Sequence, residues 1–294
     1  MKNKIIQSLK VIVMLIIFTV MIYYLANNWS SLKEYDLTFN PIFLIISFIL
    51  LGLSHILASI GWNLILKLLK SNIPQKSASG IYFISQLGRY IPGKVWYILG
   101  RVGMTRKHNV PKRIIILSGF LELILVMASA SIIFLLALIF FPIIPEIQNY
   151  LPHLTTLVIL ILIGIHPKSL NILLKILKKT EMKIKLSYTK ILLTLLFFIV
   201  VWIIKGIAFY YLISSITILD ISSLFWIISV FSISWVIGYL ILITPGGIGA
   251  REGLIIYLLS PLFPIPLTIA ISLLTRIWMI ITEFTLSIAG LKLK

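Results

Sequence analysis

Long hydrophobic runs alternate along the chain with short segments that contain Lys and Arg. A helix needs about 20 apolar residues to cross the hydrocarbon core of a bilayer. Runs near that length lie at 9–26, 41–66, 114–141, 151–166, 191–213, 222–243 and 266–290. The pattern predicts an all-α, polytopic integral membrane protein in which each of these runs is a spanning helix.

Two further apolar segments, 77–101 and 241–259, are interrupted by Pro-Gly sequences. Proline removes a backbone donor and glycine permits non-helical torsion angles, so each interruption opens helical hydrogen bonds at membrane depth. Such openings are tolerated only where protein or water covers them. The residues at the two breaks are Pro92, Gly93, Pro245, Gly246 and Gly247. We therefore expect two discontinuous or re-entrant helical elements.

The two breaks occupy corresponding places in the chain. Pro92 follows two spans from the N-terminus, and Pro245 follows two spans after the basic segment that ends at Lys190. This correspondence predicts a single transmembrane domain, 1–294, with a divergent internal repeat. The predicted halves are 1–166 and 191–294, and the basic cytoplasmic loop that joins them is 167–190.

The composition excludes a water-soluble globule. Hydrophobic residues make up 60% of the 294-residue chain, against roughly 45 to 50% in ordinary soluble domains. The absence of cysteine excludes disulfide bonds, thiolate metal sites and a cysteine nucleophile. The charged residues are 26 Lys and Arg against 8 Asp and Glu, a formal net charge of +18.

The distribution of charge predicts the orientation, because short cytoplasmic loops carry the excess of Lys and Arg. If the first broken segment enters and leaves on the inner side, the inner segments contain 20 cations and the outer loops only Lys33. Both termini are thus predicted in the cytoplasm, with about eight crossings of the cytoplasmic membrane. The cations of 167–190 are expected at anionic lipid headgroups rather than at nucleic acid.

Eight charged residues remain at or near membrane depth. They are Arg89, Lys94, Glu122, Lys205, Arg251, Glu252, Arg276 and Glu283. A charge inside a span costs about 3 kcal/mol on insertion scales, so these side chains are expected to pair or to line a hydrated cavity. Interhelical salt bridges that only fix the packing are the alternative. Arg276 and Glu283, two helical turns apart on one face, each need a partner on another element.

Paired broken helices in matching halves are typical of the substrate site of transporters. The free N–H groups at the start of a half-helix bind anionic groups, and Lys94 and Arg251 lie beside the two predicted starts. An anionic headgroup such as a phosphate is therefore the expected ligand. A simple kink or loop turn at each break is the alternative.

Four sequence stretches resemble the transmembrane region of the lysylphosphatidylglycerol synthase and flippase family, also called flippase-like proteins. They are GRYIPGKVWYILGR (88–101), FLEL (120–123), TPGGIGAREG (244–253) and LLTRIW (273–278). The resemblance implies a membrane domain of the kind implicated in moving aminoacylated phosphatidylglycerol across the bilayer, with relatives in glycolipid and surface-polysaccharide pathways. The positions that it carries over are Pro92, Gly93, Arg101, Glu122, Pro245, Gly246, Gly247, Gly249, Glu252 and Arg276.

The chain departs from that family pattern in two places. Family members often carry an Arg directly after the glutamate of the third span, whereas Glu122 is followed by Leu123, so the local charge pair is missing. No aminoacyl transferase domain is expected after Lys294, and lipid aminoacylation is not carried over.

These features predict a lipid flippase that moves an anionic or aminoacylated phospholipid, or a lipid-linked glycan intermediate, across the cytoplasmic membrane. The predicted substrate-binding residues are Arg89, Pro92, Gly93, Lys94, Arg101, Glu122, Pro245, Gly246, Gly247, Gly249, Arg251, Glu252, Arg276 and Glu283. No catalytic residue, metal or cofactor is predicted, because the chain contains neither a complete phosphate-binding loop nor histidines at metal-ligand spacing. The expected partners are membrane lipids and enzymes of cell-envelope or glycolipid biosynthesis, and no nucleic acid.

Two other functions stay open from the sequence. A membrane glycosyltransferase that uses a polyprenyl-phosphate sugar can carry an acidic pair in its first outer loop, where Glu34 and Asp36 lie. A non-catalytic scaffold for surface-polysaccharide or cell-envelope enzymes would need neither transport nor transfer.

Overall fold

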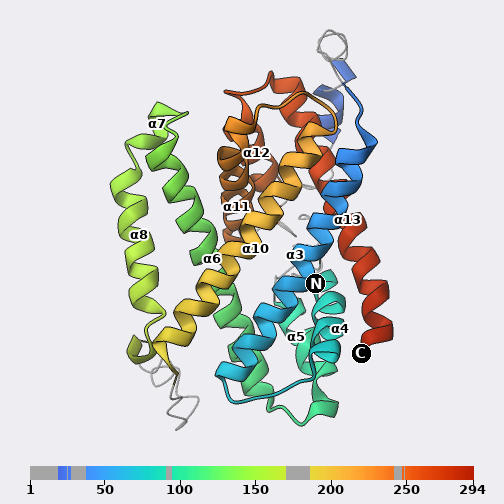
Figure 1. Cartoon of the computed structure of the whole chain (residues 1–294), viewed down its shortest axis with the longest axis vertical. Coiled ribbons are helices and arrows are strands. Elements are labelled where there is room, and N and C mark those ends of the chain that lie inside the picture. The colour runs from blue at the N-terminus through green and yellow to red at the C-terminus, as the bar shows by residue number, and fades with distance from the viewer. Residues whose placement is uncertain are drawn as a thin grey trace, which may run out of the picture.

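The computed structural model is a bundle of long apolar helices (Figure 1). It describes residues 19–24, 26–27, 38–90, 95–169, 186–241, 247 and 249–294. Every regular element named in these ranges is a helix, and five of the helical segments there are long and apolar enough to span a membrane. They are α3 (Pro41–Leu68), α6 (Lys112–Phe140), α10 (Tyr188–Ser214), η3 with α11 (Ile221–Leu240) and α13 (Ile265–Leu293). Five of the predicted runs are thereby confirmed as helices of spanning length.

The other two predicted runs have a different outcome. The run at 151–166 forms α8 (Leu151–Gly164), which has 14 residues. At 1.5 Å per residue α8 extends about 21 Å, short of the roughly 30 Å hydrocarbon core. Most of the run at 9–26 lies outside the described residues, so the count of about eight crossings stays a prediction. The short connecting helices are η2 (Arg106–His108), α7 (Pro145–Gln148) and η3 (Ile221–Ser223), which precedes α11 (Leu224–Leu240).

The sequence of α3 produces a helix suited to lipid. At its start, the Asn40 side-chain oxygen accepts hydrogen bonds from the N–H groups of Ile42 and Phe43, at 3.0 and 3.2 Å, and Pro41 fits the first turn. Large apolar side chains on one face are exposed, namely Ile42, Ile45, Ile49, Leu53 and Ile56. Polar side chains on the opposite face are buried, namely Ser47, Ser54 and His55. An apolar exterior over a polar interior is expected for a helix surrounded by lipid.

Close helix packing organises the bundle (Figure 1). α3 lies along α10, α11 packs against α6, α10 and α12 (Ala250–Leu259), and α13 packs against α4 (Gln75–Gln86). A Cβ added at Gly206 would lie 2.6 Å from Cα of Ile228. One added at Gly80 would lie 2.8 Å from the carbonyl oxygen of Gly290. Small residues at these contacts let membrane helices approach backbone to backbone.

The first interrupted segment folds as α4, η1 (Leu87–Tyr90) and α5 (Trp96–Met104). The chain turns back on itself here, because a Cβ at Gly88 would lie 2.7 Å from the backbone nitrogen of Tyr97. The predicted break at Pro92 and Gly93, with the neighbouring Lys94, lies outside the described residues. The described flanks are helical on both sides of it.

The second interrupted segment lies between the end of α11 at Leu240 and the start of α12 at Ala250. Gly247 and Gly249 have φ angles of +73° and +89°, in the left-handed region that glycine adopts without strain. A Cβ at Gly247 would lie 2.3 Å from the carbonyl oxygen of Gly238 on α11. Pro245 and Gly246 lie outside the described residues.

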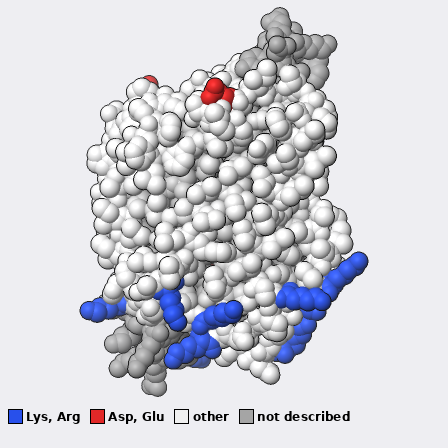
Figure 2. Space-filling model, viewed as in Figure 1, with Lys and Arg blue, Asp and Glu red and all other residues white. Residues whose placement is uncertain are grey.

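Exposed charges separate to the two ends of the bundle (Figure 2). Lys and Arg gather at the end where α3 finishes and where α6 and α10 begin. The exposed cations of the described chain at this basic end are Lys67, Lys70, Lys76, Arg106, Lys107, Lys112, Arg113, Lys168, Lys190, Lys292 and Lys294. Exposed acids, Glu146 in α7 and Asp220 before η3, lie at the opposite end. The broad band between the two ends shows no charge on the viewed face, as a lipid-contacting surface requires.

Candidate functional site

Charged side chains gather in the interior of the bundle and contact both of its apolar clusters. One cluster includes Trp202 and Phe231, and the other includes Trp62 and Tyr82. The charged residues with a relative exposure of 7% or less are Arg101, Glu122, Arg251, Glu252, Arg276 and Glu283. Charges at this depth must be paired, hydrogen-bonded or hydrated, because an isolated one is too costly to bury.

Arg101 on α5 forms a bidentate pair with Glu122 on α6. Its Nη1 donates to Oε2 of the carboxylate and its Nη2 to Oε1, the latter at 3.4 Å. The third donor, Nε, reaches the Ser85 hydroxyl of α4 at 3.1 Å. The guanidinium carbon also lies 4.5 Å from the Trp62 ring centroid and 4.6 Å from that of Tyr82. Arg101 thus joins both arms of the first folded-back segment to α6 and α3.

This pair corrects two expectations. Arg101 is one of the 20 cations that the charge distribution assigned to the inner segments, yet its side chain is fully buried. The lack of a cation directly after Glu122 suggested that a charge pair was missing, but α5 supplies that cation from another part of the chain. A cation next to a basic segment has the charge pattern of a surface residue, so only the family resemblance assigned Arg101 to the site.

Glu252 fixes the start of α12. One carboxylate oxygen, Oε2, accepts a hydrogen bond from the N–H of Gly249 at 2.7 Å. The other, Oε1, lies 3.6 Å from Nη1 of Arg276 on α13. The Arg276 guanidinium carbon lies 5.6 Å from the centroid of the Tyr90 ring in η1. Through these contacts the charged start of α12, the last helix and the first folded-back segment meet.

Glu283 pairs with a residue that the sequence did not indicate. Its Oε1 lies 3.6 Å from Nε2 of His55 on α3, and Nδ1 of His55 lies 2.9 Å from the carbonyl oxygen of Leu51. Because a carbonyl oxygen can only accept, Nδ1 donates, and a proton must then sit between Nε2 and the carboxylate for the two to attract. Nothing in the sequence surroundings of His55 signals a carboxylate partner.

Arg251, near the start of α12, is buried. Its Nε and Nη2 have no hydrogen-bond partner among the described residues, and its relative exposure is 5%. The guanidinium carbon lies 5.1 Å from the Phe231 ring centroid on α11. A Cβ placed on Gly238, two turns along the same face of α11, would lie 3.0 Å from Cβ of Arg251. The ring face attracts the cation weakly, but it supplies no acceptor for the two N–H groups.

Two more cations form cation–π contacts with aromatic rings. The Arg89 guanidinium lies 5.4 Å from the Trp235 ring centroid on α11 and 5.5 Å from that of Tyr97, and its Nε has no hydrogen-bond partner among the described residues. Nζ of Lys205 lies 4.9 Å from the Trp202 ring centroid. Both cations are partly buried.

The interior of the described bundle contains more basic than acidic side chains. Each of the three glutamates has its own partner, in the pairs Glu122–Arg101, Glu252–Arg276 and Glu283–His55. Arg89, Lys205 and Arg251 have no acidic partner within 4.0 Å in the described chain. The six buried charged residues together with Arg89 and Lys205 form what we call the buried charged group. This group is suited to an anion that would bring acceptor oxygens to the unsatisfied guanidinium donors.

Uncharged polar side chains also lie in the interior of the bundle, and the sequence did not indicate them. Gln86, at the end of α4, is 1% exposed, and neither its Oε1 nor its Nε2 has a hydrogen-bond partner among the described residues. The hydroxyl of Tyr239 donates to that of Tyr97 at 3.3 Å. A buried amide with both atoms unsatisfied is rare in proteins, and its only sequence signal is its place three residues before Arg89.

Nine of the predicted site residues lie in the described part of the chain. They are Arg89, Arg101, Glu122, Gly247, Gly249, Arg251, Glu252, Arg276 and Glu283. Pro92, Gly93, Lys94, Pro245 and Gly246 lie outside the described residues, as do Glu34 and Asp36. Among the side chains that the structure describes, no three of His, Asp or Glu gather closely enough to hold a metal ion.

Comparison with known proteins adds one match. Residues 7–287 match the family model described as the lysylphosphatidylglycerol synthase TM region, which is nearly the whole chain and includes every residue of the buried charged group. Searches of curated proteins and of solved structures gave no match.

Proposed function

The chain belongs to the family of the lysylphosphatidylglycerol synthase transmembrane region, and from this membership we propose that it is a lipid flippase. The proposed substrate carries an anionic headgroup: a phospholipid, an aminoacylated phospholipid or a lipid-linked glycan intermediate. We assign the protein to the cytoplasmic membrane, with its basic end and both termini on the cytoplasmic side.

The observation that supports this proposal most directly is the surplus of buried and partly buried cations. Arg251 presents two N–H donors without acceptors, and Arg89 and Lys205 also lack an acidic partner in the described part of the chain. A lipid phosphate supplies several acceptor oxygens and negative charge, and the guanidinium fork matches a phosphate in bidentate geometry. One such group would satisfy Arg251 and compensate its neighbours.

The start of α12 contributes to the same proposed site. The first N–H groups of a helix have no partner within it and attract anions. Glu252 accepts a hydrogen bond from the N–H of Gly249, and in this proposal the next N–H groups of α12, beside Arg251, would face the headgroup. The pairing of Glu252 with Arg276 would hold this helix end in place while the headgroup binds.

The two folded-back segments provide a route for movement in this proposal. The headgroup would enter the buried charged group while the apolar tails stay in the surrounding lipid. Rearrangement of the segments near Gly88 and Gly247 would open the group to one leaflet and then to the other, as in transporters built from repeats. The sequence contains no nucleotide-binding motif, so a lipid gradient or ion coupling would drive the movement.

Reconstitution tests the proposal. Wild-type protein in liposomes should move fluorescent phosphatidylglycerol between leaflets. A membrane-impermeant reductant quenches only the lipid in the outer leaflet, so the fraction of fluorescence that it cannot quench reports the movement. Arg251→Gln should reduce the rate about 10- to 100-fold, because charged hydrogen bonds contribute about 1.5–3 kcal/mol. Arg106→Gln, an exposed cation at the basic end, is the matched control and should transport normally. Full activity of Arg251→Gln would remove the proposed role of the surplus cations.

The two alternative functions, glycosyltransferase and scaffold, predict different experimental results. Turnover of a polyprenyl-phosphate sugar in detergent, where no leaflets exist, would identify a glycosyltransferase, and Asp36→Asn should then abolish it. A scaffold would show neither activity and would instead retain cell-envelope enzymes through purification.

A further inference from the structure

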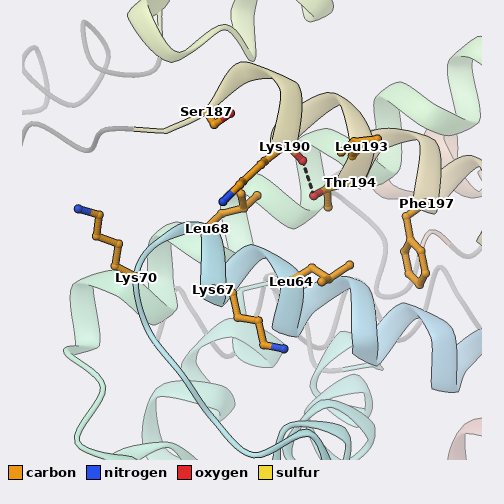
Figure 3. Close-up of a pocket in the computed structure, with 9 residues that line it drawn as sticks. All are labelled: Leu64, Lys67, Leu68, Lys70, Ser187, Lys190, Leu193, Thr194 and Phe197. Atoms are coloured by element: carbon orange, nitrogen blue, oxygen red, sulfur yellow. Dashed lines mark hydrogen bonds between the residues drawn. The ribbon is translucent and has the colours of Figure 1, made fainter.

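A second basic site lies at the surface, where the end of α3 meets the start of α10 (Figure 3). It is a groove of about 460 Å³, and we name it the lysine groove after Lys67, Lys70 and Lys190. Its lining shares no residue with the buried charged group. We propose that the lysine groove binds one anionic phospholipid, with the phosphate at the lysines and an acyl chain along the adjacent apolar wall.

The charge of the lysine groove is of one sign. Lys67, Lys70 and Lys190 are all exposed, and the lining contains no Asp or Glu. In Figure 3, Lys190 extends from α10 toward Leu68, and Lys67 and Lys70 leave the end of α3 on either side of it. The groove opens at the basic end of the bundle, and basic pockets between membrane helices on that side bind anionic lipid headgroups.

The order of residues along both helices matches a phospholipid rather than a free anion. On α10, Lys190 is followed on the same face by Leu193 and Phe197 toward the middle of the bundle. On α3, Leu64 lies one turn deeper than Lys67. Each helix therefore presents a cation at headgroup depth and apolar side chains where an acyl chain would run. A soluble phosphate would make no use of this wall.

The backbone at Lys70 gives additional support. Lys70 has a φ angle of +57°, a backbone conformation that residues other than glycine rarely adopt. It follows the last turn of α3, where the N–H of Ser71 donates to the carbonyl of Leu66 at 2.9 Å and closes the helix end. Glycine or asparagine suits that position better. A lysine here is explained if its charge serves the groove.

The test compares two triple variants by native mass spectrometry after equilibration with mixed lipid. The groove variant is Lys67→Gln/Lys70→Asn/Lys190→Gln, and the control variant is Lys107→Gln/Lys112→Gln/Arg113→Gln, which removes three exposed cations outside the groove. Wild type and control should retain about one more phosphatidylglycerol per chain than the groove variant. Retention of phosphatidylcholine should be the same in all three.

Several outcomes would overturn the proposal. These are equal retention of phosphatidylglycerol by groove and control variants, an equal loss of phosphatidylcholine, or displacement of the retained lipid by glycerol phosphate. If the groove variant does not fold, Lys190→Gln alone should weaken phosphatidylglycerol retention against Lys112→Gln. Both triple variants keep Arg251 and the buried pairs intact, so the result is independent of the transport test.

Discussion

Arg101 and Glu122 form a fully buried ion pair between α5 and α6, although they lie 21 residues apart in the chain. The same guanidinium donates to Ser85 on α4. One side chain therefore holds the two arms of the first folded-back segment together and fixes both to a spanning helix. The position of that segment depends on this contact.

Glu122→Gln should lower the free energy of unfolding by about 3–5 kcal/mol, because it leaves a buried arginine without a counter-charge. The double variant Arg101→Leu/Glu122→Leu should recover a large part of that loss, since no unpaired charge remains. Unfolding by denaturant in detergent micelles, followed by helical circular dichroism, measures both. A single variant as stable as wild type would mean that water or another anion already compensates Arg101.

Gly88→Ala tests the fold-back of the same segment. The added Cβ would lie 2.7 Å from the backbone nitrogen of Tyr97, and backbone atoms cannot move away as a flexible side chain can. We expect a loss of about 1–3 kcal/mol in the free energy of unfolding, as for other overpacked sites.

Gly103→Ala on α5 is the control for Gly88→Ala, because a Cβ there would meet no atom within 4 Å. It should be neutral or raise stability by about 0.5–1 kcal/mol, as alanine is favoured over glycine within helices. If both glycine variants behave alike, the close approach at Gly88 is not the cause.

The spanning helices could be predicted because the bilayer imposes a local rule on sequence. In α3 and α6 a continuous apolar run is sufficient evidence of a helix, since every backbone group must be satisfied within the segment. The same rule indicated that Arg276 and Glu283 need partners. It could not name those partners, because Glu252 and His55 are distant in sequence and come close only through tertiary packing.

Other features of the site were not predictable for a related reason. Arg101 stands at the edge of a basic segment, so the family resemblance and no local pattern assigned it to the site. Gln86 is an uncharged residue in a helix, and neither the resemblance nor a local pattern indicated it. Their burial depends on how α4, α5 and α6 pack. α8 ends at Gly164, two residues before the end of the predicted run at 151–166, and Pro167 follows soon after.

His55→Phe should lower the free energy of unfolding by about 1–3 kcal/mol, because Glu283, which is 3% exposed, loses the imidazole nitrogen that lies 3.6 Å from its carboxylate. His55→Gln should restore part of that loss, because its amide can donate to the carboxylate. Thermal unfolding of the three proteins in one detergent is the measurement. Equal stability of the Phe and Gln variants would show that the pair contributes packing and no hydrogen bond.

We expect a substitution at Lys70 to raise stability and to weaken lipid binding. Its left-handed backbone, with φ of +57°, costs a lysine roughly 1–2 kcal/mol relative to glycine. Lys70→Gly should therefore raise the free energy of unfolding by about 1 kcal/mol, whereas Lys67→Gly, inside the last turn of α3, should lower it by about 0.5–1 kcal/mol. Both variants remove one cation from the lysine groove, so both should retain less phosphatidylglycerol. A Lys70→Gly protein that is more stable and binds less lipid would show that the strained lysine serves the groove and not the fold, while an unchanged or lower stability would contradict the backbone argument.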